Sequence, residues 1–339
     1  MEPEITQLDP ADEATVEAVQ ALRIAVEAAD IPDFPPPCPY AFRAELTFPR
    51  TTKRSEHFVA RSGGTVAGYL ALDLPLRENL DNLDVSLAVH PAHRRRGVGR
   101  ALHAYLLERM RELGRSRYAA GTVEALPGGP ARDDSGRWFA ATVGAKSALD
   151  EVRRRLDLTA LDEAAVDRML AEATAKAAGY RLVTWQDAAP EEYAADVGYL
   201  DGRLVSDAPM GDLRWDPPKV DVARLREVDQ AIGAGRWHRY SAGAVHEGSG
   251  RMVALTTIAR QETSPWHAFQ WITLVDPEHR GHRLGALVKV ANLRYAQRHE
   301  PKLRVVDTWN AAVNQHMIAI NEAIGFRPVD AWANWQLEL

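Results

Sequence analysis

One stretch of this sequence occurs twice, and this repetition constrains the fold more than any other feature. Residues 89–99 align without a gap with residues 275–285, at an offset of 186 (275 − 89), and the copies share Val, Pro, His, Arg and the final Gly. A repeat on the scale of a domain predicts two related domains rather than a solenoid. In a chain of 339 residues we expect domains over 1–160 and 161–339, the second opening with a linker helix at 162–178.

Each copy of the repeat lies between a predicted strand and a predicted helix. Residues 84–89 are rich in β-forming side chains, and Leu102 and Leu106 begin a series of apolar residues at helical spacing after the loop. Residues 268–275 and 286–298 repeat this arrangement around the second copy. The sequence therefore predicts two strand–loop–helix units of the same design.

A strand that runs through such a loop into a helix can bind a phosphate group. The first N–H groups of a helix have no partner within it, and the helix dipole places partial positive charge at that end. Gly97 and Gly99 carry no Cβ, so an anion can approach the backbone, and the arginines at 94–96 add positive charge. The second copy has Arg283 in place of Gly97, which makes the same close approach harder.

The order Arg94-x-x-Gly97-x-Gly99 after a Val-x-Pro strand end resembles the acyl-CoA pyrophosphate loop of the GNAT acetyltransferase superfamily. Downstream of the second copy, Asn314 and a helix that ends in Gly-Phe at 325–326 resemble a second signature of the superfamily. The layout is similar to that of two-domain actinobacterial members. This resemblance implies an α/β (α+β) fold with two tandem domains, each a mixed, mostly antiparallel sheet flanked by helices.

The resemblance also implies acetyl-CoA as co-substrate, with its pyrophosphate held by backbone amides of the loop. In the first domain, the residues that it places at the co-substrate are Leu87, Val89, Arg94, Arg95, Arg96, Gly97, Val98, Gly99 and Arg100. In the second domain, they are Leu274, Val275, Arg280, Gly281, His282, Arg283, Leu284, Gly285 and Asn314. The first domain has the intact loop and the second has the better downstream helix, so both remain candidates.

Acetyl transfer to an amine requires a neutral amine and a proton donor, or solvent, for the departing thiolate. Asp84, before the first loop, and Asp307, after the second helix, are the candidate bases, although either could be a surface carboxylate or a cap. Many family members carry a Tyr four residues before the Gly of the Gly-Phe pair. Asn321 and Ala140 occupy that position here, so this proton donor does not carry over.

Composition and motifs exclude several other functions. The net charge of −6 disfavours nucleic-acid binding, and the loops carry no Gly-Lys-Ser/Thr of a mononucleotide-binding P-loop. Neither His90 with His93 nor His279 with His282 is accompanied by Cys or clustered carboxylates, so we expect no metal. A single cysteine, an acidic start without an apolar core and no run of roughly 20 apolar residues predict a cytoplasmic protein without a membrane segment.

Two functions follow from these observations. The first is an acyl-CoA-dependent N-acetyltransferase that transfers acetyl directly to a primary amine, with a small molecule as acceptor. The alternative is a CoA-binding module or scaffold without catalysis, in which one or both domains are degenerate. The missing Tyr and the presence of Arg283 favour the alternative, whereas the repeated loop and the downstream helix favour the enzyme.

Overall fold

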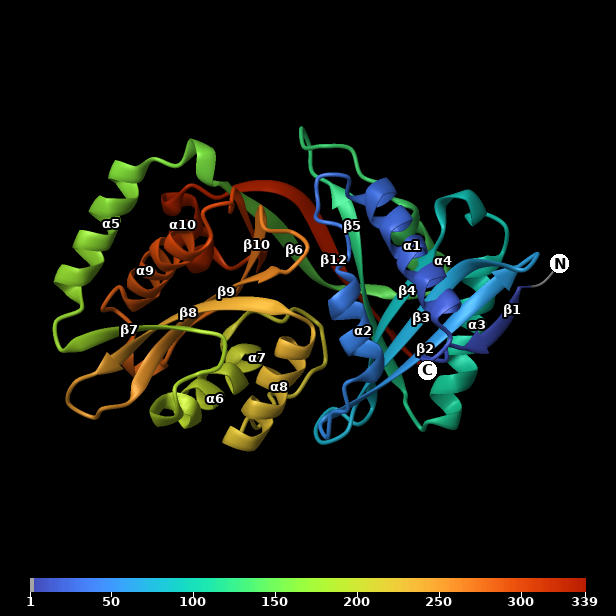
Figure 1. Ribbon diagram of the computed structural model, residues 1–339, viewed down its shortest axis with the longest axis horizontal. Coiled ribbons are helices and arrows are strands. Elements are labelled where there is room, and N and C mark those ends of the chain that lie inside the picture. The colour runs from blue at the N-terminus through green and yellow to red at the C-terminus, as the bar shows by residue number, and fades with distance from the viewer. Residues whose placement is uncertain (1–2) are drawn as a thin grey trace. The chain divides into compact units, whose positions relative to one another are not determined.

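The computed structural model describes residues 3–339, which form two compact units (Figure 1). The first unit comprises residues up to 150 together with 211–215 and 330–339, and the second comprises 151–210 and 216–329. Each unit holds a sheet with helices on both of its faces. The structure confirms the predicted α/β (α+β) class.

The first unit has a mixed sheet in the order β1-β2-β3-β4-β5-β12, in which only the β4–β5 pair is parallel. Its elements are β1 (Glu4–Gln7), α1 (Glu13–Asp30), α2 (Pro39–Thr47), β2 (Lys53–Ser62), β3 (Thr65–Pro75), β4 (Asn82–Val89), α3 (Val98–Glu112), β5 (Arg117–Ala125), α4 (Ser135–Thr142) and β12 (Arg327–Glu338). The first predicted strand–loop–helix unit is β4, the loop after it and α3, which together lead from β4 to β5.

Two layers of apolar side chains hold the helices of the first unit to its sheet. Leu102, Leu106 and Met110 recur every four residues on α3 and are fully or almost fully buried against one face. On the other face Val19 of α1 and Phe42 of α2 belong to a second buried cluster. The helical spacing in the sequence therefore gave the correct inward-facing side of α3.

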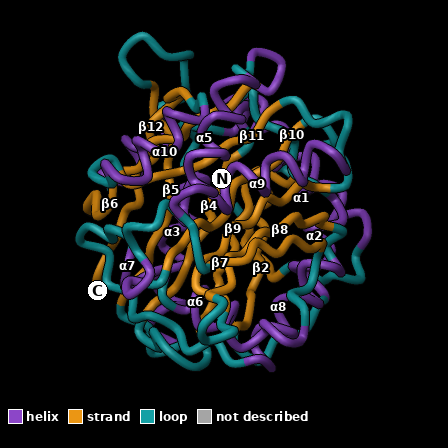
Figure 2. The backbone as a smooth tube through the Cα atoms, turned by 90° about the vertical axis from the view of Figure 1, so that its left-hand side faces the viewer, coloured by secondary structure: helices purple, strands orange, loops and turns teal. Residues whose placement is uncertain are grey.

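The second unit has a sheet of the same design in the order β6-β11-β10-β9-β8-β7, in which only the β10–β11 pair is parallel. Its elements are β6 (Lys146–Asp157), α5 (Glu163–Lys176), β7 (Tyr180–Gln186), α6 (Ala194–Gly202), α7 (Leu204–Asp207), α8 (Val222–Ala234), β8 (Trp237–His246), β9 (Met252–Gln261), β10 (His267–Val275), α9 (Leu284–His299), β11 (Val305–Ala311) and α10 (Gln315–Ile324). In Figure 2, α6 and α8 lie on one side of strands β7–β9, and α5 and α9 lie on the other.

Each sheet is completed by a strand from the other half of the sequence. Residues 151–157 of β6 pair with β11 in the second unit, and residues 330–338 of β12 pair with β5 in the first. The continuous ranges 1–160 and 161–339 therefore do not describe the compact units. The helix expected at 162–178 is α5, and it packs on α9 within the second unit, where Arg294 contacts Asp167 at 2.6 Å.

Candidate active site

The first loop forms the N-terminus of α3 through two residues in left-handed conformation. A short 3-10 helix, Pro91–His93, follows β4, and Arg95 and Gly97 then adopt φ of 62° and 90°. Gly97 caps α3 without a side chain, and the first helical hydrogen bond runs from the amide of Ala101 to the carbonyl of Gly97. The amides of residues 98–100 precede that bond and have no partner within the helix.

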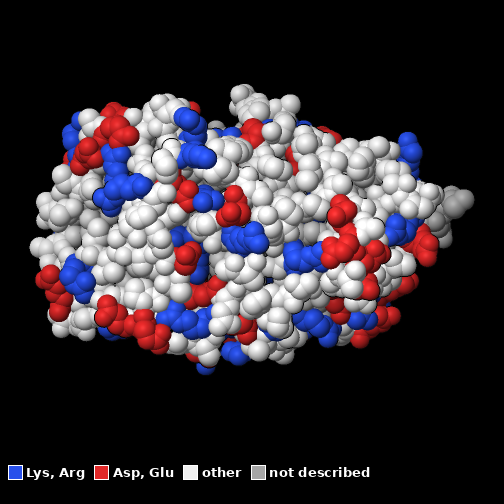
Figure 3. Space-filling model, in the orientation of Figure 1, with Lys and Arg blue, Asp and Glu red and all other residues white. Residues whose placement is uncertain are grey.

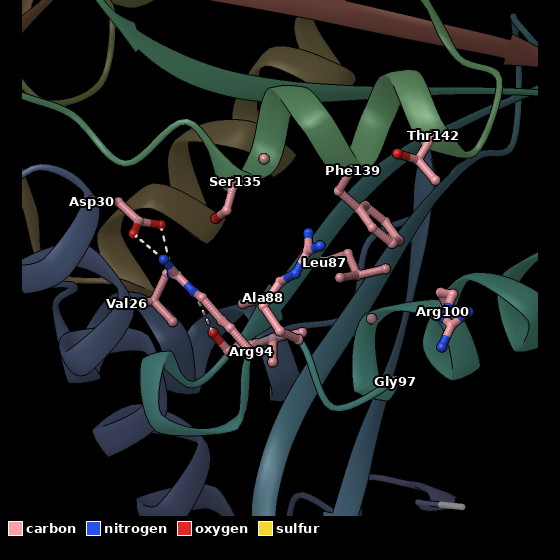
Figure 4. A pocket seen from close by; sticks show the side chains of 14 residues that line it. Val26, Asp30, Leu87, Ala88, Arg94, Gly97, Arg100, Ser135, Phe139 and Thr142 are labelled. Atoms are coloured by element: carbon pink, nitrogen blue, oxygen red, sulfur yellow. Dashed lines mark hydrogen bonds and ion pairs between the residues drawn. The ribbon is translucent and has the colours of Figure 1, made fainter.

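A cavity of about 430 Å³ lies over these amides (Figure 4). Its lining comes from the end of β4, the start of α3, the end of α1 and one face of α4: Val26, Asp30, Leu87, Ala88, Val89, Arg94, Arg95, Gly97, Gly99, Arg100, Ser135, Gly136, Phe139 and Thr142. In Figure 4 the Phe139 side chain points from α4 toward Leu87. A Cβ at Gly99 would lie 3.4 Å from the Phe139 ring, so glycine keeps this part of the cavity open.

Three of the four arginines of the first loop are available to an anion. Arg95, Arg96 and Arg100 are exposed, and among the described residues their guanidinium groups have no ion-pair partner. Arg94 has a different role from the expected one. It contacts Asp30 at 2.8 Å and Asp133 at 2.9 Å, and its Nε donates to the Val89 carbonyl at 3.3 Å.

Arg94 therefore anchors the loop through these ion pairs, and its charge is already neutralised by carboxylates. It joins the end of α1 to the segment before α4, and Figure 4 shows it pointing toward Asp30. Burial raises the pKa of Asp30 although the ion pair opposes this effect. Sequence reasoning missed Asp30 and Asp133, because no local pattern links them to a loop far away in the chain.

The parallel strands of the first unit separate at Asp84. The β4–β5 ladder has three pairs, Asn82↔Arg117, Leu83↔Tyr118 and Asp84↔Ala119, and no further pairs follow. Residues 85–89 pair only with β3, so the edge of β4 that faced β5 is open from there to the cavity. Asp84 is solvent-exposed at the point of separation, and partial desolvation by the protein atoms around its carboxylate, together with Asp73, raises its pKa.

The second loop has the same path but different electrostatics. Gly281 and Arg283 adopt φ of 89° and 56°, so an arginine caps α9 in the left-handed conformation that Gly97 adopts in the first unit. Arg280 contacts Asp207 at 3.1 Å, and Arg283 contacts Glu172 at 2.6 Å. Both arginines of this loop are thus already paired with carboxylates.

The cavity at the second loop is larger, at about 860 Å³, and both of these carboxylates line it. Of the residues that the resemblance places at the co-substrate, Leu274, Val275, Leu284 and Gly285 also line it, and His282 does not. Asn314 lies at the wall, where its Oδ1 accepts from the Met317 amide at 3.2 Å and caps α10.

Asp307 is not placed to act as a base. Its carboxylate is fully buried and accepts hydrogen bonds from Arg153 Nη1 at 2.9 Å, Arg155 Nε at 2.8 Å and His267 Nε2 at 2.9 Å. Burial alone would raise the pKa of Asp307, but hydrogen bonds from Arg155 and His267 outweigh it and hold the pKa below its usual range. The expected catalytic role is therefore replaced by a structural one, because both carboxylate oxygens are occupied.

A β-bulge changes which residues correspond between the two units. The β9–β10 ladder shifts register between Gln270 and Thr273, so the gapless offset of 186 holds after the bulge and falls to 185 (269 − 84) before it. Counted along the parallel ladders, the third pair is Asp84↔Ala119 in the first unit and Phe269↔Asp307 in the second. An aromatic ring thus replaces Asp84 at the second point of strand separation.

Neither unit offers the proton donor that many family members use. Asn321 is fully buried, and its Nδ2 donates to Asn310 Oδ1 at 2.6 Å. Ala140 packs in a small cluster with Ala333 and Trp335. Any protonation of a leaving thiolate at these positions has to come from solvent or from another group.

The loop histidines have local roles. His90 Nδ1 accepts from the Ala92 amide at 3.2 Å, and His279 Nδ1 lies 2.9 Å from the Tyr180 hydroxyl. Within residues 3–339 no three His, Cys, Asp or Glu side chains are grouped so that they could hold a metal ion. The same residues include no helix that is long and apolar enough to cross a lipid bilayer.

Comparison with known proteins decides the family. Residues 21–127 match the model of the acetyltransferase (GNAT) family. The whole fold resembles a solved tandem GNAT protein from the clavulanic acid biosynthesis pathway, with 36% identity, a TM-score of 0.83 and coverage of 99% of this chain and 98% of the other. The chain belongs to the GNAT family. The tandem layout and the class of N-acetyltransferases, both expected from the sequence, are thereby confirmed at the level of the family.

Curated relatives are similar over shorter stretches or at lower identity. A mycothiol acetyltransferase from Saccharopolyspora erythraea is 52% identical over 56 residues, so this chain spans only 18% of that protein's length. Another from Actinosynnema mirum is 26% identical over 278 residues, or 80% of each chain. A GCN5-related N-acetyltransferase from Sphaerobacter thermophilus shares the fold, with 17% identity and a TM-score of 0.65.

Proposed function

We propose that this protein transfers an acetyl group from acetyl-CoA to the primary amine of a small molecule, and that the first unit performs the reaction. One observation carries the proposal: in the first unit alone, an anion-binding helix N-terminus with unpaired arginines leads along an open strand edge to a carboxylate. The cavity at Gly97 and Gly99 would hold the pyrophosphate, and the free edge of residues 85–89 would hold the arm that carries the thioester.

Charge favours the first unit as the co-substrate site. Coenzyme A is a polyanion, and charge-assisted hydrogen bonds from arginine to phosphate are among the stronger ones in proteins. The first loop offers three exposed guanidinium groups, at Arg95, Arg96 and Arg100. In the second loop a phosphate would have to displace Glu172 or Asp207 and then lie close to it. We therefore place the tighter site at α3.

The chemistry would follow from the position of Asp84. An alkyl amine arrives protonated and has no lone pair, so it must lose a proton before it attacks the thioester carbonyl. Asp84 stands where β4 and β5 separate, beside the open edge of β4. Holding amine and thioester together in this way can lower the barrier by ~7–11 kcal/mol, so a modest base suffices. Solvent would protonate the thiolate.

The acceptor is a small molecule in this proposal. Several curated relatives are named mycothiol acetyltransferases, which supports a small acceptor without identifying it. On the face drawn in Figure 3, acidic and basic side chains are interspersed, and the net charge is −6. Neither observation suits a nucleic-acid partner, which calls for an extended basic surface. We likewise place the protein in the cytoplasm and expect no metal in the reaction.

Calorimetric titration of acetyl-CoA tests this assignment. Gly99→Glu would place a carboxylate in the first cavity, and Gly285→Glu does the same in the second at the equivalent position. We expect wild type and Gly285→Glu to keep the tight site and Gly99→Glu to lose it. Absence of binding to the wild type, or loss only in Gly285→Glu, would contradict the proposal.

The hydrogen bonds that occupy both carboxylate oxygens of Asp307 favour a second function for the second unit. With its base position filled by Phe269 and Asp307 fully hydrogen-bonded, this unit fits a CoA-binding module without catalysis. Release of free thiol from acetyl-CoA, measured with a panel of small amines, separates the two functions. We expect Gly285→Glu to keep turnover and Asp84→Asn to lose it. Turnover that survives Asp84→Asn but not Gly285→Glu would assign the reaction to the second unit.

A further inference from the structure

We propose that Asp73 is a positioning residue for acetyl transfer: its negative charge, facing Asp84 across the β3–β4 ladder, makes Asp84 a better proton acceptor. This inference rests on the proposed function, in which Asp84 takes the proton of the amine. It extends that function from a single carboxylate to a pair whose two members have different tasks.

The ladder places the two carboxylates on one face of the sheet. Asp73 and Asp84 are direct partners in the antiparallel β3–β4 pair. Side chains that are directly opposite in such a pair point to the same side, with Cβ atoms about 4.5–5.5 Å apart. Like charges in that arrangement repel each other, so one member of the pair is pushed toward its protonated form.

The surroundings decide which member that is. Lys53 Nζ lies 2.6 Å from Asp73 Oδ2, and the Ser55 hydroxyl donates to Asp73 Oδ1 at 2.5 Å. Asp73 thus has a donor on each oxygen, and both favour its charged form. Among the described residues no side chain donates to Asp84, for which the Val85 amide is the hydrogen-bond donor. The side-chain donors are therefore gathered on Asp73, and Asp84 is the member of the pair that has only a backbone donor.

The charged groups that face Asp84 are few. Asp73 on β3 opposes its ionisation and Lys53 on β2 favours it, while its partner on β5 is the uncharged Ala119. Because the Lys53 ammonium forms an ion pair with Asp73, its charge acts mainly on Asp73 and less on Asp84. Burial and then Asp73 raise the pKa of Asp84, and this brings its proton affinity closer to that of an amine. Each unit of that approach makes the free amine about tenfold more populated.

The step balances without a further reagent. The acceptor enters as an ammonium with three protons on nitrogen, and Asp84 takes one of them as the nitrogen lone pair is freed. The nitrogen then bonds to the thioester carbon and the C–S bond breaks. The second proton leaves the nitrogen and reaches the CoA thiolate through solvent, and the third stays on the amide. Asp84 afterwards returns its proton to water.

The pH dependence of kcat/KM for amine acetylation tests the pair, because this profile reports the groups of the free enzyme. In wild type we expect a limb that rises with pH as Asp84 loses its proton. Asp73→Asn removes the opposing charge and leaves Lys53 free to favour ionised Asp84, so the limb moves to lower pH by about one unit. Lys53→Met leaves Asp73 uncompensated, so the limb moves to higher pH.

Opposite displacements by these two variants support the pair, and a merely structural role for Asp73 would not produce them. Limbs of Asp73→Asn and Lys53→Met that coincide with the wild-type limb, or that move in the same direction, overturn the inference. If one variant fails to fold, the direction of the other still decides. Asp84→Asn is the separate check on the proposed function: if its limb is that of the wild type, Asp84 is not the base, whatever Asp73 does.

Discussion

The two units share a framework and differ where chemistry would take place. In both, a parallel ladder of three pairs ends beside a loop that begins a helix. At the end of that ladder the first unit has Asp84 facing Asp73, and the second has Phe269 facing Ala259. The second unit has a carboxylate one strand further on, at Asp307, but there it accepts hydrogen bonds from buried Arg153 and His267 and from half-buried Arg155. The same fold thus places a carboxylate at the end of the parallel ladder in one unit and buries a hydrogen-bonded carboxylate in the other.

The loops differ in the same sense. Gly97 adopts a left-handed φ at no steric cost, and the arginines that follow Arg94 are open to solvent. Arg283 adopts the same conformation with a side chain, and Glu172 and Asp207 neutralise the second loop. A repeated motif can thus preserve its geometry while its charge is neutralised.

Removing the charge of Asp307 should produce the largest loss of stability. Asp307→Asn leaves buried Arg153 without its counter-charge and gives buried His267 a weaker acceptor, and breaking a buried ion pair in this way costs about 3–5 kcal/mol. Denaturant unfolding measures the loss. Glu172→Gln, which breaks an exposed pair in the same unit, is the matched control and should change stability by less than about 1 kcal/mol. Equal, small effects of both variants would contradict the structural role of Asp307.

Local periodicity predicted what is local in this fold. The spacing of Leu102 and Leu106 gave α3, and the repeated loop gave two strand–loop–helix units, because both depend on neighbours in sequence. Pairing between distant segments was beyond that reasoning. The exchange of 151–157 and 330–338 between the sheets follows from which strand covers an edge, and no residue pattern in either segment encodes its partner.

The same limit applies to the candidate site. The repeat in the sequence located both strand–loop–helix units but could not show that Arg94 is held by Asp30 and Asp133. The offset of 186, if extended back along the strand to Asp84, would lead to Gln270, whereas the bulge makes Phe269 the counterpart. Single insertions and long-range ion pairs leave no periodic trace, so they are found only in three dimensions.

Lys289 should make the second unit more stable at alkaline pH. This side chain is 2% exposed, its ammonium lies 5.5 Å from the centre of the Phe326 ring, and it forms no ion pair with the described residues. Burial lowers its pKa from 10.5 to about 7. The unfolded chain therefore binds an additional proton between pH 7 and 10.5, and stability rises with pH through that window.

Lys289→Met tests this effect by removing the buried amine while keeping its bulk. We expect a gain of up to roughly 4 kcal/mol at pH 7, which shrinks as the pH approaches 10. Hydrogen exchange on the full chain, followed in peptides of α9 and β10, measures it within the second unit. A variant that is less stable than the wild type at pH 7 would mean that the amine makes a favourable contact there.

His57 should give the first unit a window of the same sign at lower pH. The ring is buried and its Nδ1 lies 2.7 Å from the Tyr69 hydroxyl, and burial lowers the pKa of His57 from 6.5 to about 4. The unfolded chain binds the proton first as pH falls, so stability is full above pH 6.5 and declines toward pH 4, by up to roughly 3 kcal/mol. Protection factors in peptides of β2 and β3, which correct for the intrinsic pH dependence of amide exchange, should fall over this range, and His57→Gln should flatten the dependence. An unchanged slope in His57→Gln would assign the acid sensitivity to other groups.

The smallest expected effect restores the missing glycine. Arg283→Gly relieves the strain of an arginine in left-handed conformation, which is worth about 1 kcal/mol. It also gives the unfolded backbone more freedom and removes an exposed ion pair with Glu172, so the net change in stability should stay within about 1 kcal/mol.

The Arg283→Gly variant is informative for binding, because the N-terminus of α9 becomes open to an anion. We expect calorimetry on Arg283→Gly combined with Glu172→Gln to show acetyl-CoA affinity at the second cavity that rises toward that of the first. If affinity falls instead, Arg283 itself binds the phosphate, and the second loop has changed its means of recognition rather than lost it.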